Sequence, residues 1–308
     1  MLAARQTANC WHGIGPILVT RTRRRGGVCR AQTEIPSDPV DPVCVGFEPS
    51  TCNTNVSVWQ IPNSPDFPPE MRGARVLMLD ESGNLHSVYR EGQALTGAYW
   101  DCLALLPAVV PEGPVAILGL GAGTIAHIVH ALYPQRQMHG WELDPAVVAL
   151  AQQHMGLQQL TNNGCLVAHV GDALADSAVV APPGAAGIVV DLFAAGQLIP
   201  QLTQASAWAR IRRRLAPGGR VMTNLGAAPV AGMMGRPDPA VATTRQALAA
   251  MAEAFEGQLS YCSFMTGASA NMVVITGPPI SRQDWAAAPQ QLQHLAKSSW
   301  EMWKGSNS

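Results

Sequence analysis

The segment Val115-Ala-Ile-Leu-Gly-Leu-Gly-Ala-Gly-Thr124 is the main basis for the fold that we predict for this chain of 308 residues. It opens with four apolar residues, which is typical of a strand buried on both faces of a parallel sheet. Three glycines follow, and residues 125–133 then show a helical pattern that stops at Pro134. Glycines between a strand and a helix allow a tight turn and a close approach of a ligand to the backbone. The stretch therefore predicts a nucleotide-type α/β domain.

The spacing of the three glycines narrows the kind of nucleotide. Gly119, Gly121 and Gly123 form the pattern G-x-G-x-G. A dinucleotide fingerprint has the pattern G-x-G-x-x-G, which would require glycine at position 124, where this chain has Thr124. The spacing makes an NAD-dependent oxidoreductase the least favoured of the enzyme hypotheses. The free N–H groups at the start of the following helix could still bind a polar group of a nucleoside.

Strands and helices are predicted to alternate over the residues that follow the glycine loop. The expected strands cover residues 138–142, 165–170, 187–191, 220–225, 259–264 and 271–276. The expected helices cover residues 145–155, 203–215 and 241–255. Regular alternation of this kind predicts a doubly wound, mostly parallel sheet.

Three acidic residues end successive predicted strands. Glu142 is about 20 residues beyond the loop, where a carboxylate can accept hydrogen bonds from both ribose hydroxyls. Asp172 ends the next strand and can accept a hydrogen bond from an adenine amine, whereas Asp191 ends the strand after that. Asn224 ends the fifth strand.

Because the carboxyl ends of parallel strands meet at one edge of the sheet, Glu142 and Asp172 are predicted to bind the nucleoside. Asp191 is predicted to orient or deprotonate the acceptor. For each acid the alternative is a helix cap, a loop cap or a solvated charge.

The remainder of the chain divides into segments of different character. Residues 1–33 contain six arginines and no acidic residue, which is typical of an organelle transit peptide, with a chloroplast favoured over a mitochondrion and a plain basic tail as the alternative. Residues 34–54 read as a Pro-rich linker. We expect a small β unit with a hairpin over residues 55–94 and the α/β domain over residues 95–280. Residues 281–308 are expected to form a C-terminal tail.

Composition excludes several classes of partner. The net charge of −1 gives no long-range attraction to nucleic acid, and no long apolar run predicts a membrane span. The five histidines between positions 127 and 169 lack the short spacing of metal ligands, so no metal is expected. The expected partner is a small-molecule acceptor.

This order of motifs resembles the class I S-adenosylmethionine-dependent methyltransferase superfamily and, within it, the spermidine synthase-like family. Beyond the strand-end acids, the resemblance rests on the hairpin sequence Arg75–Asp80, on Ala98-Tyr-Trp-Asp101 before an apolar helix, and on residues 191–202. It implies a Rossmann-like seven-stranded sheet beside the small N-terminal β unit, and often a homodimer. It also implies S-adenosylmethionine or its decarboxylated form as cofactor. Tyr99 and Trp100 fall in the family's Tyr-His-Glu segment, and we assign them to substrate binding, with core packing as the alternative.

The chain departs from the aminopropyltransferases of this family at three positions. Ala122 stands where their glycine loop has an acid, Ala194 stands at the second acid of their strand-four loop, and Trp100 replaces their histidine. Desolvating the amines of a polyamine substrate without carboxylates costs several kcal/mol each. We therefore favour methyl transfer, keep aminopropyl transfer in polyamine biosynthesis as the alternative, and keep a non-catalytic nucleoside-binding organelle factor as a further one.

Overall fold

A computed structural model describes residues 41–80, 84–228, 239–266, 269–298 and 300–305. The predicted transit peptide at residues 1–33 lies outside the described residues. Within the described ranges, no helix is both long and apolar enough to cross a membrane.

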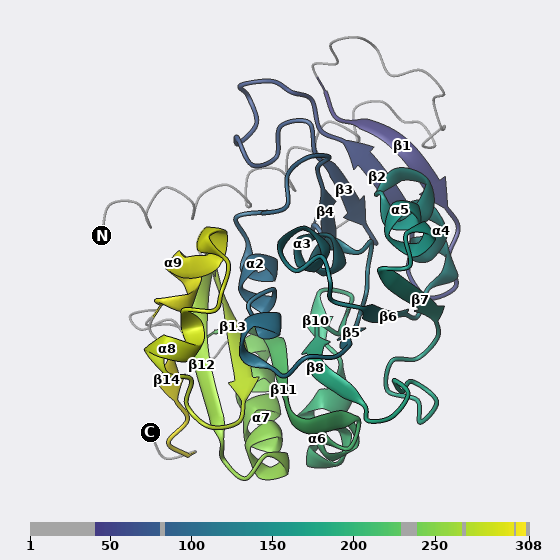
Figure 1. Cartoon of the computed structure of the whole chain (residues 1–308). Coiled ribbons are helices and arrows are strands. Elements are labelled where there is room, and N and C mark those ends of the chain that lie inside the picture. The colour runs from purple at the N-terminus through teal and green to yellow at the C-terminus, as the bar shows by residue number, and fades with distance from the viewer. Residues whose placement is uncertain (1–40, 81–83, 229–238, 267–268, 299, 306–308) are drawn as a thin grey trace.

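An eight-stranded sheet forms the centre of the molecule, with the strand order β14-β12-β13-β11-β8-β5-β6-β7 (Figure 1). Its strands are β5 (Val115–Leu118), β6 (Met138–Glu142), β7 (Leu166–Val170), β8 (Ala185–Val190), β11 (Leu215–Ala227), β12 (Leu259–Thr266), β13 (Ser269–Thr276) and β14 (Glu301–Met302). The five strands β7, β6, β5, β8 and β11 are parallel, and β13, β12 and β14 continue the sheet in antiparallel pairs. The predicted Rossmann-like α/β fold is confirmed.

The expected number of seven strands requires a correction. The eighth strand, β14, comes from the segment that we expected to be a tail, and it pairs with β12 through Tyr261 opposite Glu301. A strand of two residues is too short to show the alternation of apolar and polar side chains by which strands are recognised.

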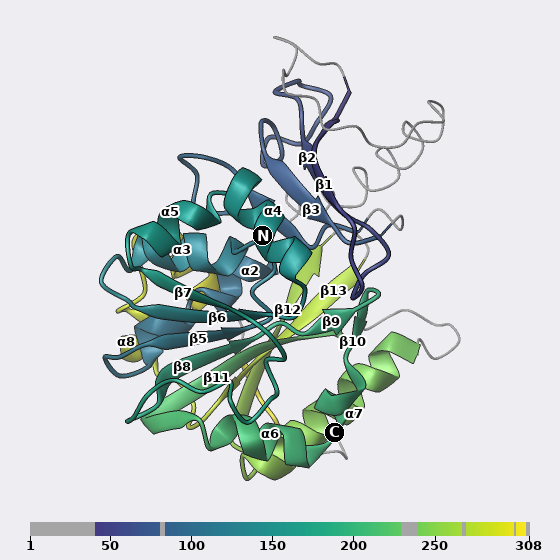
Figure 2. The same ribbon diagram turned by 90° about the vertical axis from the view of Figure 1, so that its right-hand side faces the viewer.

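Helices cover both faces of this sheet, as Figure 2 shows. One face carries α2 (Tyr99–Leu103), α3 (Thr124–Leu132), α4 (Pro145–His154) and α5 (Leu157–Asn162), and the other carries α6 (Ala205–Arg212) and α7 (Pro239–Ala254). Two hydrophobic clusters correspond to these two layers, the first around Ile117, Ile128 and Leu150 and the second around Trp208 and Met251. The sheet side chains alternate between them: Ile117 belongs to the first cluster, and its neighbour Leu118 belongs to the second. This arrangement explains why β5 is apolar at every position.

A separate four-stranded antiparallel sheet lies at the N-terminal side of the described chain. It consists of β1 (Val43–Glu48), β2 (Val56–Gln60), β3 (Arg75–Met78) and β4 (Ser87–Tyr89), in that order. The predicted pairing of β3 with β4 is present, with Val76 opposite Val88. However, β1 lies within the segment 34–54 that we expected to be a linker. The prolines on both sides of β1 favoured the linker interpretation in the sequence analysis. In the structure, β1 is stabilised by antiparallel pairing with β2.

The C-terminal residues pack against the molecule rather than trailing from it. They form α8 (Arg282–Trp285), the short 3-10 helix η5 (Gln290–Leu292), α9 (Gln293–Ala296) and β14. Trp285 is buried in the first hydrophobic cluster and its ring stacks on Trp300 at a centroid distance of 5.5 Å.

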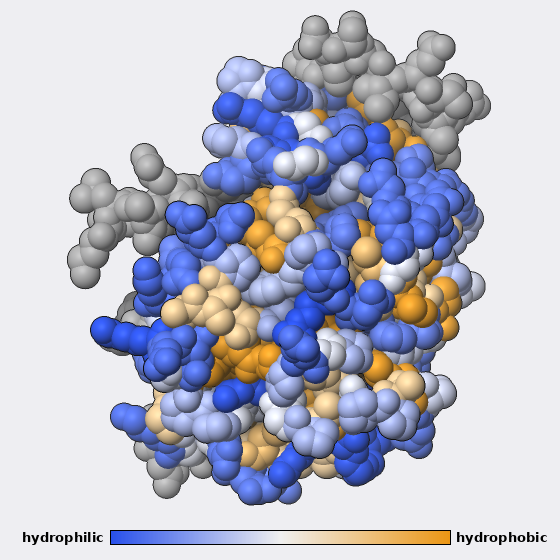
Figure 3. Space-filling model, viewed as in Figure 1, coloured by the Kyte–Doolittle hydropathy of each residue, from blue (hydrophilic) through white to orange (hydrophobic). Residues whose placement is uncertain are grey.

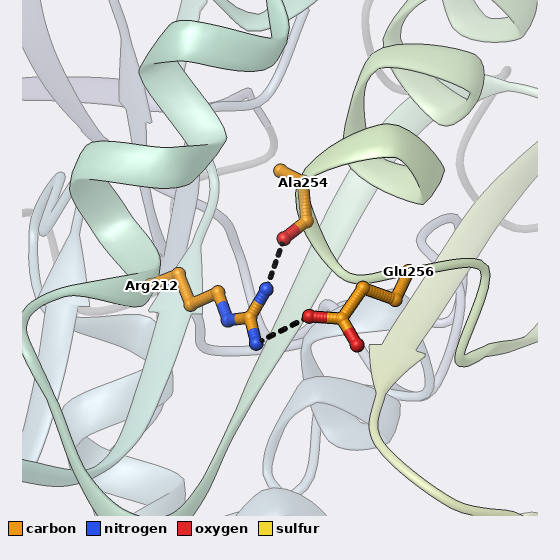
Figure 4. Close-up of polar contacts among 3 residues, drawn as sticks. All are labelled: Arg212, Ala254 and Glu256. Carbon is orange, nitrogen blue, oxygen red and sulfur yellow. Dashed lines mark hydrogen bonds and ion pairs between the residues drawn. The ribbon is translucent and has the colours of Figure 1, made fainter.

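Arg212 and Arg214, near the end of α6, both donate hydrogen bonds to other parts of the protein. Arg212 donates to the carbonyl oxygen of Ala254 at 2.7 Å and pairs with Glu256 at 2.8 Å, so it holds the end of α7 against α6 (Figure 4). Arg214 donates to the carbonyl oxygens of Ala173 and Ala175. The side chains of Arg212 and Glu256 are 48 % and 66 % exposed, so the contribution of this ion pair to stability is small, on the order of 1 kcal/mol or less.

Candidate functional site

The glycine loop connects the end of β5 to the start of α3. Gly119, Gly121 and Gly123 all have positive φ angles, of 90°, 54° and 88°. A β-carbon at Gly119 would overlap the carbonyl oxygen of Asp191, so the loop can lie against the end of β8 only because this residue is glycine. The loop thus brings the ends of β5 and β8 into direct contact.

Glu142 holds the middle of this loop. Its Oε2 accepts a hydrogen bond from the backbone N–H of Gly121 at 2.9 Å, and its Oε1 accepts one from the N–H of Asp144 at 3.1 Å. Burial raises the pKa of the Glu142 carboxyl group, while these backbone hydrogen bonds lower it. Each oxygen retains lone pairs that could accept hydrogen bonds from ribose hydroxyls, because a carboxylate offers about four acceptor positions.

Asp172 lies beside Glu142 in the sheet, since the N–H of Gly171 donates to the carbonyl oxygen of Glu142 at 2.8 Å. The Oδ1 atom of Asp172 accepts a hydrogen bond from the N–H of Leu174, and the side chain is exposed at the sheet edge. The structure therefore places Gly119, Gly121, Glu142 and Asp172 along one continuous edge.

Two apolar side chains next to these acids were missed by the sequence analysis. Leu143 follows Glu142 directly and is 58 % exposed, and Val170, which pairs with Glu142 in the sheet register, is 56 % exposed. Exposed apolar side chains beside polar groups are typical of a ligand site. An apolar residue directly after the strand-end acid is the signal in the sequence that could have identified Leu143.

Asp191 is surrounded by hydrogen-bond donors. Its Oδ2 accepts hydrogen bonds from the Tyr99 hydroxyl at 3.0 Å and from the Trp100 indole N–H at 3.2 Å, and its Oδ1 accepts one from the Asn224 amide at 3.1 Å. Asn224 is itself oriented, because its Oδ1 accepts the N–H of Gly226 at 2.9 Å. Tyr99 and Trp100, which we assigned to substrate binding, thus contact the predicted catalytic acid directly.

The surroundings of the Asp191 carboxyl group change its acidity. Burial raises the pKa of the Asp191 carboxyl group to about 6, although the hydrogen bonds from Asn224, Tyr99 and Trp100 lower it. Burial and the neighbouring carboxylate also raise the pKa of Tyr99 well above its ordinary value. A carboxyl group with a pKa near 6 can bind and release a proton near neutral pH, as a general base requires.

Hydrogen bonds made by Ser87 and Val88 of β4 join the N-terminal sheet to the glycine loop and the start of α3, and we call this contact the β4 clamp. The Ser87 hydroxyl accepts the N–H of Ala122 at 2.9 Å. The Thr124 hydroxyl donates to the carbonyl oxygen of Val88 at 3.0 Å and accepts its N–H at 2.9 Å. Thr124, the residue that departs from the dinucleotide pattern, therefore serves to dock β4. Ser87 carried no signal in the sequence, because its role depends on this docking.

Ala122 and Ala194, the two positions where the family resemblance implied acidic residues, occupy different environments. Ala122 is 1 % exposed beneath the β4 clamp, whereas Ala194 is exposed in the hairpin of β9 (Phe193–Ala194) and β10 (Gln197–Leu198). Within the described residues, no group of three or more His, Cys, Asp or Glu side chains could hold a metal ion.

These residues fit an S-adenosyl group. Glu142 and Asp172 offer acceptors to ribose and adenine, Leu143 and Val170 offer apolar contact to a flat ring, and Asp191 lies beyond the loop. These acceptors and apolar side chains are thus the groups expected of a nucleoside site at the carboxyl edge of a doubly wound sheet.

Comparison with solved structures defines the class of fold. The chain superimposes on a probable spermidine synthase from Corynebacterium glutamicum with a TM-score of 0.59 and 16 % identity, covering 84 % of this chain and 96 % of that one. It superimposes on spermidine synthase from Thermotoga maritima with a TM-score of 0.55 and 9 % identity, covering 91 % of each chain. The chain therefore has the spermidine synthase-like fold, as predicted.

Sequence comparison identifies more particular relatives. The chain is 26 % identical over 152 residues to a probable polyamine aminopropyl transferase of Bifidobacterium longum, covering 46 % of this chain and 30 % of that protein. It is 31 % identical over 97 residues to the eEF1A lysine and N-terminal methyltransferase of Bos taurus, covering 27 % of this chain and 13 % of that protein. It spans less than a third of the length of either relative. No family model matches the sequence.

Proposed function

We propose that the chain is a transferase that uses S-adenosylmethionine and carries a methyl group to a small-molecule acceptor. The observation that carries this proposal is the Asp191 carboxylate, held by three donors at the end of β8 and directly beside the glycine loop. Relatives of both transferase kinds, a polyamine aminopropyl transferase and a methyltransferase, support the wider class.

Each residue of the site has a role in this proposal. Glu142 and Asp172 bind and orient the nucleoside, and Leu143 excludes water from one side of its ring. The bound cofactor would supply an electrophilic carbon bonded to a positively charged sulfur, and this sulfur would leave as a neutral thioether when the carbon–sulfur bond breaks. Asp191 accepts the proton that the acceptor atom loses, while Tyr99, Trp100 and Asn224 hold the carboxylate in place. Transfer of this kind depends mainly on positioning the two reactants.

The missing acids favour methyl transfer over aminopropyl transfer. This chain has alanines, Ala122 and Ala194, at the two positions where the resemblance to aminopropyltransferases implies a carboxylate. Aminopropyl transfer is the second candidate, because three spermidine synthase structures share the fold and one of them is a complex with the transition state analogue AdoDATO.

Calorimetric titration separates these candidates. We expect S-adenosylmethionine and S-adenosylhomocysteine to bind more tightly than decarboxylated S-adenosylmethionine. Tighter binding of the decarboxylated form, with a product formed from putrescine, would establish aminopropyl transfer instead. If the nucleoside binds but Asp191→Asn changes no transfer activity on a broad acceptor panel, the non-catalytic alternative is supported. Light scattering of the same samples tests the homodimer that the family resemblance implies.

We also propose a chloroplast location, with the mitochondrion as the alternative. Six arginines and the absence of acidic residues among residues 1–33 support an organelle address. Fluorescent fusions of the full chain, with and without these residues, test the proposal in plant cells. Retention of the same location after their removal would contradict it.

A further inference from the structure

A polar cleft lies between the N-terminal sheet and the helix pair α4–α5, away from the residues of the candidate cofactor site. Its volume is about 390 Å³, which is within the range of small-molecule sites. Figure 1 shows α4 and α5 beside β1, and Figure 3 shows hydrophilic residues gathered over α5. Gly119, Glu142 and Asp191 are not among the lining residues, so this cleft is distinct from the site described above.

Arg75 supplies a fixed positive charge on one side of the cleft. Its Nε donates to the Gln60 side chain at 3.1 Å, and its Nη1 donates to the carbonyl oxygen of His154 at 2.6 Å. These two bonds hold the guanidinium plane in place. Among the described residues, Nη2 makes no hydrogen bond, so this atom can donate to a ligand.

Glu91 supplies the opposite charge. Its side chain is exposed and lines the same cleft, and no ion pair joins it to Arg75 within the part of the chain that the structure describes. Tyr89 lines the same cleft, and both charges act on its hydroxyl group. The pKa of Tyr89 is raised by burial and by Glu91, and it is lowered by Arg75. The cleft therefore presents separated charges of both signs around one phenol.

The remaining lining is mostly made of amides. The side chains of Gln153, Gln159 and Asn162 are among those that α4 and α5 turn to the cleft. Each amide offers both donors and an acceptor, and none adds net charge. Such a lining suits a neutral but strongly polar molecule, and it suits neither an apolar ligand nor an ion of large charge.

We propose that this cleft binds a small zwitterion of amino-acid type, with its carboxylate on Arg75 and its ammonium group on Glu91. Arginine and glutamate are the ordinary charge-assisted partners of these two groups. The amides would bind a polar side chain of the same molecule. The proposal does not depend on the transferase function, because it concerns direct binding at a separate site.

The probe is L-glutamine, whose side-chain amide can pair with the amides of the cleft. Calorimetric titration of the full chain should show saturable binding of L-glutamine. N-acetyl-L-glutamine lacks the ammonium group, and L-glutamine amide lacks the carboxylate. Each should bind at least roughly tenfold more weakly than L-glutamine. Equal binding of all three compounds, or of none, would overturn the proposal. A Gly-Gln dipeptide, in which the two charges lie further apart, distinguishes a free amino acid from a peptide end.

Two substitutions connect the binding to the named residues. Glu91→Gln lies at an exposed position that the fold does not depend on, and it should weaken binding of L-glutamine roughly tenfold while leaving N-acetyl-L-glutamine unchanged. Arg75→Lys keeps the charge but loses the planar fork, and it should weaken both ligands. Glu112→Gln and Arg282→Lys, at exposed positions outside the cleft, are the matched controls. Binding that is as tight in Glu91→Gln as in the unchanged chain would refute the assignment.

Discussion

At the scale of single residues, the environment of Asp191 determines what the site can do. An aspartate at a strand end is usually ionised well below neutral pH. Burial raises the pKa of this one to about 6, even though three donors from α2 and β11 stabilise its charged form. The carboxylate is thus ionised at neutral pH yet basic enough to accept a proton from an acceptor.

The first prediction concerns the pH dependence of transfer. The base must be deprotonated, so kcat/KM should rise with pH through an apparent pKa of about 6 and level off above it. Asp191→Asn should lower kcat/KM by roughly 100-fold or more and remove this limb of the profile. A pH–rate profile of both proteins measures it. Asp66→Asn, at an exposed position, should reproduce the unchanged profile.

The second prediction concerns cofactor affinity. Glu142→Gln keeps the shape of the side chain but loses the charge that would strengthen hydrogen bonds to ribose. The affinity for S-adenosylhomocysteine should fall roughly 10- to 100-fold, which corresponds to about 1.5–3 kcal/mol. Glu112→Gln, at an exposed position that precedes β5 and so lies at the opposite end of this strand from the glycine loop, is the control for calorimetry. Unchanged affinity in Glu142→Gln would show that the nucleoside binds elsewhere.

At the scale of elements, the contact between β4 and the start of α3 joins the two sheets. Thr124 satisfies both backbone groups of Val88, and Ser87 satisfies the N–H of Ala122. These groups lie in the buried part of the molecule, where an unsatisfied backbone group is costly. The clamp therefore fixes the position of the N-terminal sheet relative to the glycine loop.

The third prediction tests this clamp. Thr124→Val leaves the N–H and C=O groups of Val88 without their partner, so the free energy of unfolding should fall by about 2–4 kcal/mol. Thr124→Ser retains the hydroxyl and should lose less than about 1 kcal/mol. Urea denaturation followed by circular dichroism measures both variants. Similar losses in the two variants would mean that the methyl group, rather than the hydroxyl, matters.

At the scale of the whole molecule, the C-terminal residues complete the sheet and the first hydrophobic cluster. β14 covers the outer edge of β12, and Trp285 is buried in the cluster that also includes Ile117 and Ile128. An edge strand without such cover offers free backbone groups to other chains. The described C-terminal segment is therefore part of the folded domain.

The fourth prediction concerns this segment. Trp285→Ala should lower the free energy of unfolding by about 3–5 kcal/mol, because it removes a large buried side chain and the stacking contact of that side chain with Trp300. Met302→Ala, at a side chain that is 53 % exposed, should change it by less than about 0.5 kcal/mol. Thermal unfolding of both variants tests this, and a small effect of Trp285→Ala would place the segment outside the cooperative fold.

Local patterns in the sequence predicted most of the strands and helices from β5 to β13, the glycine loop and the acids at the ends of β6, β7 and β8. Each of these depends on local periodicity or on residues a few positions apart, so each leaves a readable pattern. Only the packing of the chain shows that Ser87 contacts the glycine loop, that Thr124 contacts Val88, that Tyr99 and Trp100 donate to Asp191, and that β1 and β14 are strands. These features depend on contacts between residues far apart in the chain. Such contacts form only when the two sheets and α2 pack together, and no local pattern records them.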